Sequence, residues 1–358
     1  MGYLRVLIAA AALSAWAAPG DAFLTSPLAP GLRRATSAVA SGPRSGACSL
    51  RAQAAPERFV RRDALGRAAG LAAAFSVAAV SPAPTWAEDS LESPIVVFGA
   101  SGGTGAEVVD YSSVVAEIPT RAVLRAKMNS KGKEVAFEQA DATMLAVAEG
   151  SVLDPVSVAA AVKGARAVVF AASASKKGGD AEAVDYKGLL IVAKACIDAK
   201  VPRLVVVSSG AVSKPDAAVY QLLNTFGKIM YWKKKGEDEM KEMYKANGDD
   251  AVSYTVVRPG GLGTGAGLGP KFIELNQGDE KTGKITRADV AAICVQCIEF
   301  PGAAGATFEC YSADSARKLE TVAEKLPFAK KDGALLGTGR ECRGETWPSI
   351  FGQLEKDA

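Results

Sequence analysis

From residue 95 onward, the apolar residues form short runs that alternate with amphipathic stretches. Short segments rich in apolar residues predict strands, which we expect at 95–98, 120–124, 144–148, 167–171, 204–207, 254–257 and 307–310. Apolar residues at helical spacing predict a helix after the first strand and further helices at 155–163, 181–200, 219–246 and 287–300. This alternation predicts an α/β fold, a single domain with a Rossmann-like doubly wound parallel β-sheet and helices on both faces.

A glycine-rich turn joins the first strand to the first helix. Gly99, Gly102 and Gly105 have the spacing G-x-x-G-x-x-G. Glycines permit a tight turn, and the following helix directs N–H groups and a positive dipole end at an anion, so the pattern predicts a phosphate site. The spacing differs from G-x-G-x-x-G, and no Lys-Ser/Thr pair follows as in a P-loop. The alternative is a turn without a ligand, which seldom needs three glycines.

The second strand ends without the acidic residue that often binds an adenosine ribose. Instead, Arg125 lies 20 residues after Gly105, and residues 121–127 contain no acid. A guanidinium suits a 2′-phosphate, which predicts NADP(H) rather than NAD(H). The alternative is a solvated arginine at a strand end.

The first 87 residues have the composition of targeting sequences. We expect a signal peptide at 1–22, a plastid transit peptide at 23–57 and a twin-arginine-like thylakoid signal at 58–87, which includes Arg61 and Arg62. These segments predict a plastid (chloroplast) protein in the thylakoid lumen, with a stromal or thylakoid-anchored protein as alternatives. The apolar stretch 65–80 is short for a bilayer span, so we expect no stable span in the mature chain.

The remaining chain is expected to form a Rossmann domain at 88–315 and a C-terminal tail at 316–358 that packs on it. The first 87 residues hold nine of the 42 basic and three of the 39 acidic residues, which leaves residues 88–358 with a net charge of −3. This charge gives no reason to expect a nucleic-acid partner.

The chain has no histidine, which excludes histidine triads and histidine metal ligands. Cys294 and Cys297 form a C-x-x-C within a helical pattern, so we expect buried thiols and no metal site. A disulfide between Cys310 and Cys342 remains open.

Several motifs follow one another in a familiar order. They are the glycine turn, Arg125, 150–154, 171–173, 185–188, 207–209, 231–235, 258–262 and 285–290. In this order they resemble the atypical short-chain dehydrogenase/reductases with an NAD(P)H-binding domain. The likeness is to plastid and cyanobacterial members, some of which serve in photosystem assembly or at the import translocon, and it covers about residues 95–312.

The resemblance implies a set of cofactor contacts. Gly99, Gly102 and Gly105 would hold the pyrophosphate, with Ser101 and Thr104 nearby, and Arg125 would take the 2′-phosphate. The other implied contacts are Ser151 and Val152 at the adenine, Ala171, Ala172 and Ser173 at the end of the fourth strand, and Pro259 and Gly260 at the nicotinamide.

The catalytic candidates are Tyr231, Lys235 and Ser209. Tyr231 and Lys235 form Y-x-x-x-K, and a spacing of four residues puts both on one helix face. An ammonium group beside a phenol favours proton exchange near neutral pH. The alternative is that residues 233–235 are a solvated charge run. The family's catalytic Ser/Thr falls on Gly210, which leaves Ser209 as the candidate hydroxyl.

Two functions fit these residues. The first is an NADP(H)-dependent oxidoreductase that acts on a small hydrophobic carbonyl or conjugated substrate. The alternative is a non-catalytic NADP-binding scaffold or assembly factor for a photosynthetic complex, which Gly210 favours. A nucleotide-sugar epimerase is a weaker third hypothesis, because little chain remains beyond residue 312 for a C-terminal substrate domain. The sequence assigns neither a substrate nor an oligomeric state.

Overall fold

The computed structural model describes residues 91–126, 135, 137, 143–174, 179–225, 227–324 and 337–358. The chain divides into two units, Met1–Val80 and Ser81–Ala358, and all described residues belong to the second. The expected signal and transit segments lie outside the described residues. Within those residues, no helix has the length and apolarity that a membrane crossing requires.

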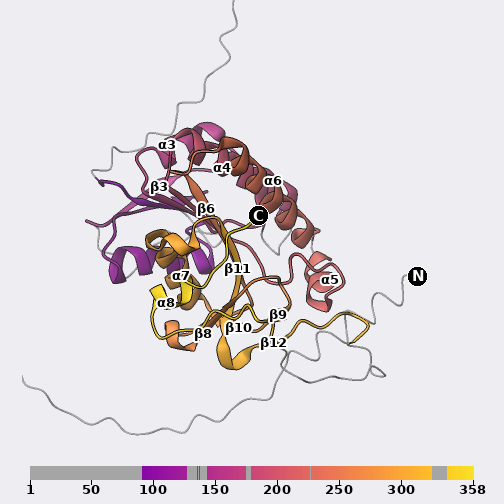
Figure 1. The fold of residues 1–358 in the computed structure, drawn as a ribbon. Helices are drawn as coiled ribbons and strands as arrows, with labels where there is room; N and C mark the ends of the chain where they lie inside the picture. The colour runs from indigo at the N-terminus through magenta and orange to yellow at the C-terminus, as the bar shows by residue number, and fades with distance from the viewer. Residues whose placement is uncertain are drawn as a thin grey trace, which may run out of the picture. The chain divides into compact units, whose positions relative to one another are not determined.

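An eight-stranded sheet forms the centre of the described unit (Figure 1). Its strands, in spatial order, are β3 (Leu145–Glu149), β2 (Thr120–Leu124), β1 (Ile95–Phe98), β4 (Ala167–Phe170), β5 (Arg203–Val207), β6 (Ser253–Pro259), β11 (Ala306–Ser312) and β8 (Ile273–Asn276). All neighbours pair in parallel except β11 and β8, which are antiparallel. The order 3-2-1-4-5-6 is that of a doubly wound dinucleotide-binding sheet, so the predicted fold class is confirmed.

Helices cover both faces of the sheet (Figure 1). The helices are α2 (Gly103–Asp110), α3 (Pro155–Val162), α4 (Leu189–Asp198), α5 (Ala218–Asn224), α6 (Ile229–Asn247), α7 (Arg287–Glu299) and α8 (Trp347–Phe351). In β1, Ile95 and Val97 pack with α2, α7 and α8, whereas Val96 and Phe98 pack with α3, α4 and α6. Because strand residues alternate between faces, apolar residues at every position of β1 fill two cores.

The expected helix over 219–246 is two helices, because the chain turns between them. Gly227 and Lys228 have φ values of 68° and 56°, which a continuous helix does not allow. Two π-helical turns also occur, η1 (Tyr111–Val115) after α2 and η2 (Glu182–Gly188) before α4.

Among the described residues, four short strands also form two small sheets outside the main sheet. β7 (Gly261–Gly263) pairs in parallel with β10 (Lys284–Thr286), and β9 (Lys281–Thr282) pairs antiparallel with β12 (Arg317–Lys318). The segment after β6 is therefore attached to the chain that leads into α7.

The C-terminal segment packs on the sheet through α8. Ile350 and Phe351 are fully buried, and the ring of Phe351 stacks on Trp347 and Phe300. Cys310 and Cys342 are free thiols. Both lie opposite Leu275, on its two sides, so their Cα atoms are about two strand spacings apart, roughly 9–10 Å. That separation is too long for a disulfide, and the possible bridge is not made.

Candidate cofactor and active site

The glycine turn after β1 is tightly built. Gly99 has a φ of 80°, and a Cβ atom there would lie 2.6 Å from the backbone nitrogen of Ala172. A Cβ atom on Gly105 would lie 2.1 Å from the carbonyl oxygen of Gly99. Both positions therefore require glycine, and the backbone itself forms the surface that a ligand would meet.

The turn ends at the amino terminus of α2. Gly102 is the N-cap residue, and no side chain caps the helix. Its own N–H donates to the carbonyl oxygen of Gly99 over 2.9 Å. The first-turn amides and the positive end of the helix dipole are thus available to an anion, with Ser101 exposed and Thr104 half-buried beside them. This arrangement fits the pyrophosphate of a dinucleotide.

The expected adenosine contacts follow β2 and β3 at the same edge. Arg125 comes directly after β2 and is exposed. Ser151 follows β3, and its hydroxyl accepts a hydrogen bond from the N–H of Leu153 at 3.2 Å. Val152 is 5% exposed and packs in the core, and a Cβ atom on Gly188 would lie 2.9 Å from its Cγ2.

A buried ion pair lies at the carboxyl end of β4. Ala171 and Ala172 follow this strand, and the Ser173 hydroxyl donates to Asp185 Oδ1 over 2.7 Å. The N–H of Ala174 donates to Asp185 Oδ2 over 2.8 Å, and Lys233 Nζ lies 2.8 Å from Asp185 Oδ1. The Asp185 side chain is fully buried and that of Lys233 is 11% exposed. A lysine is therefore held beside the predicted cofactor turn.

The pairing depends on how α6 meets η2. A Cβ atom on Gly236 would lie 2.7 Å from the carbonyl oxygen of Asp185, so α6 can approach this closely only with glycine there. Lys233 lies one turn earlier on the same buried face. In the sequence, Lys233 is only one of three consecutive lysines, and nothing there distinguishes it from the other two.

Tyr231 and Lys235 lie on a neighbouring face of α6. Tyr231 is 47% exposed, and its ring meets that of Trp232 edge-on at 4.9 Å. Lys235 Nζ lies 4.4 Å from the centre of the Tyr186 ring and 3.7 Å from Glu239. Hydrogen bonding to Tyr186 raises the pKa of Lys235, which keeps it a cation. The role of these two residues in catalysis stays a prediction.

The turn after β5 faces the end of β6. The hydroxyl of Ser209 donates to the carbonyl oxygen of Gly210 over 3.2 Å, and the N–H of Gly210 donates to that of Pro259 over 2.8 Å. A Cβ atom on Gly260 would lie 2.4 Å from the carbonyl oxygen of Gly283, so the chain beyond Pro259 passes very close to another backbone.

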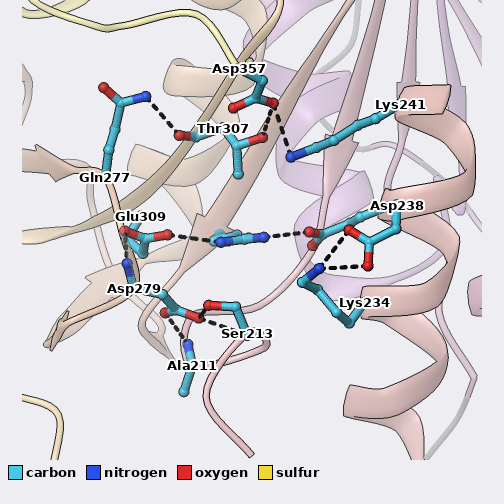
Figure 2. A network of polar contacts seen from close by, with 12 residues as sticks. Ala211, Ser213, Lys234, Asp238, Lys241, Gln277, Asp279, Thr307, Glu309 and Asp357 are labelled. Carbon is cyan, nitrogen blue, oxygen red and sulfur yellow. Dashed lines mark hydrogen bonds and ion pairs between the residues drawn. The ribbon is translucent and has the colours of Figure 1, made fainter. Parts of the chain in front are cut away.

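A buried polar network contacts the residues that follow this turn, Ala211 and Ser213 (Figure 2). Arg258 donates to Glu237 over 2.6 Å and to Glu309 over 3.2 Å, and Glu309 accepts the N–H of Asp279 over 2.9 Å. The Asp279 carboxylate accepts the N–H of Ala211 over 2.5 Å. Burial, together with the negative charge of Asp279, raises the pKa of Glu309 to about 7.

The Ser213 hydroxyl also donates to Asp279, over 2.8 Å, and the Ser213 N–H over 2.9 Å. The network therefore reaches the β5 turn at two residues, Ala211 and Ser213. No group of metal ligands occurs among the described residues.

All these turns lie at the carboxyl edge of a doubly wound sheet, where such folds bind their ligands. Residues 99–301 match the NAD(P)H-binding family, from the glycine turn to the end of α7. The chain belongs to this family. The matched residues include the glycine turn and the buried Lys233–Asp185 pair.

Individual relatives are more distant. Over 230 residues the chain is 29% identical to an uncharacterized chloroplastic protein of Arabidopsis thaliana, a match that covers 57% of this chain and 65% of that protein. Over 103 residues it is 35% identical to sanguinarine reductase of Eschscholzia californica, which covers 28% of this chain and 34% of the reductase. The matches thus span less than two thirds of the length of these relatives.

Among solved structures, the oxidoreductase ylbE of Lactococcus lactis superimposes with a TM-score of 0.50 at 17% identity. That match covers 64% of this chain and 94% of the other. At this identity the likeness concerns the fold.

Proposed function

We propose that the protein is an NADP(H)-dependent reductase of a small hydrophobic carbonyl or conjugated substrate. The observation that carries the proposal is that the glycine turn and a buried lysine, Lys233, which pairs with Asp185, both lie at the carboxyl edge of the sheet. Lys233 Nζ lies 2.8 Å from Asp185 Oδ1, and an ammonium group at the cofactor edge would stabilise negative charge that develops on a carbonyl oxygen. A reductase among the relatives agrees with this chemistry.

When bound, NADPH would supply the hydride. The protein's own residues would orient the cofactor, hold the substrate oxygen and provide the proton. The amides of the glycine turn would hold the pyrophosphate, and Arg125 would hold the 2′-phosphate. We propose Tyr231 as the proton donor and Ser209 as the hydroxyl that polarises the carbonyl. Lys235 and Lys233 are then the two candidates for the lysine that assists them.

Matched variants of Lys233 and Lys235, which lie on the same helix, can distinguish their roles. NADPH oxidation by the purified protein would be screened with aldehyde, quinone and pigment acceptors. If Lys233 assists the reaction, Lys233→Gln lowers turnover strongly and Lys235→Gln has little effect. The reverse result would assign the role to Lys235. Tyr231→Phe keeps the ring but removes the proton donor, so turnover should fall about 10²–10⁴-fold.

A non-catalytic scaffold is the second candidate, and Gly210 favours it because the family's catalytic hydroxyl is absent there. Such a protein would bind NADPH and assist a photosynthetic complex. Tight NADPH binding without hydride transfer to any acceptor, in the wild-type protein, would support the scaffold over the reductase.

We also propose a plastid location, in the thylakoid lumen. The leader composition and the chloroplastic relative support the plastid. The twin arginine at residues 61 and 62 supports the lumen.

A further inference from the structure

Arg287 lies against the glycine turn, although it is far from it in sequence. It is the first residue of α7, and it is half-buried. A Cβ atom on Gly103 would lie 2.9 Å from Arg287 Nε and 3.2 Å from Cδ, so the guanidinium passes directly over the first residue of α2. Its Nη1 donates to the carbonyl oxygen of Gly263 over 3.0 Å.

The position of the Arg287 guanidinium is electrostatically unfavourable unless an anion is bound beside it. The amino termini of α2 and α7 both carry positive dipole ends, and a positive side chain beside them is repelled. Within the described part of the chain, Arg287 makes no ion pair of 4 Å or less. Asp289, in the same turn, accepts from Thr286 and from the N–H groups of Leu268 and Gly269.

A guanidinium has five N–H donors in a planar fork, and the Gly263 carbonyl occupies one of its nitrogens. A phosphate oxygen pair matches this fork, and its charge would relieve the repulsion. We propose that Arg287 is a side-chain ligand of the cofactor pyrophosphate, together with the amides of the glycine turn. Its bond to Gly263 then links the bound cofactor to the segment that follows β6.

This inference rests on the proposed NADP(H) binding, and it assigns Arg287 a different task from Arg125. Arg125 would contact the 2′-phosphate, which NADH and ADP lack. Arg287 would contact the pyrophosphate, which NADPH, NADH and ADP all contain and 2′-AMP lacks. Comparing the affinities of these four ligands therefore distinguishes the role of Arg287 from that of Arg125.

The experiment measures dissociation constants of NADPH, NADH, ADP and 2′-AMP for the wild type and for Arg287→Gln, which removes the charge and the fork but keeps a polar side chain. We expect NADPH, NADH and ADP to bind about 10- to 100-fold more weakly and 2′-AMP to bind as before. Arg287→Lys keeps the positive charge but lacks the planar fork, so its affinities for NADPH, NADH and ADP should lie between those of the wild type and of Arg287→Gln. Arg166→Gln is the control, because this arginine precedes β4 at the opposite edge of the sheet and pairs with Glu299.

Thermal denaturation of each variant checks that it is folded. If Arg287→Gln and Arg287→Lys bind all four ligands like the wild type, Arg287 is not a ligand. Equal weakening of ADP and 2′-AMP would also overturn the assignment, because it would indicate a general distortion of the site. A wild-type protein that binds neither NADPH nor NADH would refute the proposed function, and with it the role proposed for Arg287.

Discussion

The Glu309 network predicts an unusual dependence of stability on pH. Glu237, Glu309 and Asp279 are three buried carboxyl groups around one guanidinium, that of Arg258. Burial and the nearby charge of Asp279 raise the pKa of Glu309 from 4.5 to about 7. The folded protein therefore binds a proton that the unfolded chain releases between these two pH values.

The sign of the change in stability with pH follows from proton linkage. Below the unfolded pKa of 4.5 both states hold the proton, and the associated stability is fully present. As the pH rises through the folded pKa of about 7, the folded state must ionise a buried carboxyl group, and this stability is lost. Between pH 5 and pH 8, the free energy of unfolding should fall by roughly 2 kcal/mol. The chain has no histidine, so little else titrates in this range.

The assay is urea denaturation of the wild type and of Glu309→Gln at pH values from 5 to 8. Glu309→Gln cannot ionise, so its stability should be nearly flat over this range, whatever its absolute value. Glu341→Gln is the control, since pairing with Lys281 lowers the pKa of Glu341 to about 2, outside the range. Wild-type stability that is constant or rises from pH 5 to pH 8 would refute the reasoning, as would an unchanged slope in Glu309→Gln.

Four further predictions concern the cofactor site and the leader. Arg125→Ala should erase most of a preference for NADPH over NADH, worth roughly 1.5–3 kcal/mol, and equal wild-type affinities would contradict this. Gly105→Ala should abolish NADPH binding and lower stability by about 1–3 kcal/mol, because its Cβ would lie 2.1 Å from the Gly99 oxygen, whereas Gly337→Ala should have little effect. Gly210→Ser should raise turnover if Pro259 shifts slightly, since its Cβ would lie 3.2 Å from the Pro259 oxygen; an unchanged rate would argue against a missing hydroxyl. Replacing Arg61 and Arg62 with lysine should retain a reporter fusion in the stroma, and lumenal import of that fusion would exclude the twin-arginine route.

The sequence predicted the central strands well because their signal is local. β1 and β2 have the expected bounds, since each run of apolar residues ends at polar or glycine residues. β8 was missed for the opposite reason. Its Glu274 is fully buried and accepts from Lys281 at 3.0 Å and Tyr311 at 2.9 Å. A buried acid in a short strand resembles a loop until its distant partners are known.

The residues of the candidate site likewise fall into those that local sequence signals could predict and those that depend on distant contacts. The glycine turn could be predicted because its glycines are needed for contacts within or near the turn. Lys233 could not, because three consecutive lysines do not indicate which one faces inward. The contact between Gly236 and the Asp185 backbone decides it, and that contact joins helices that are remote in sequence. Arg287 was missed because its neighbour, Gly103, lies almost two hundred residues earlier.

The buried face of α6 links these observations. Lys233 and Glu237, one turn apart, carry opposite charges, and each pairs with a different part of the protein. A buried charge costs several kcal/mol unless it is well paired, and apolar residues would pack the same face at less cost. Lys233 holds Asp185 and with it the turn after β4, whereas Glu237 holds Arg258, from which the network continues to the turn after β5. The two turns that border the proposed nicotinamide site are thus fixed to one helix, which is the rigidity that positioning a cofactor and a substrate requires.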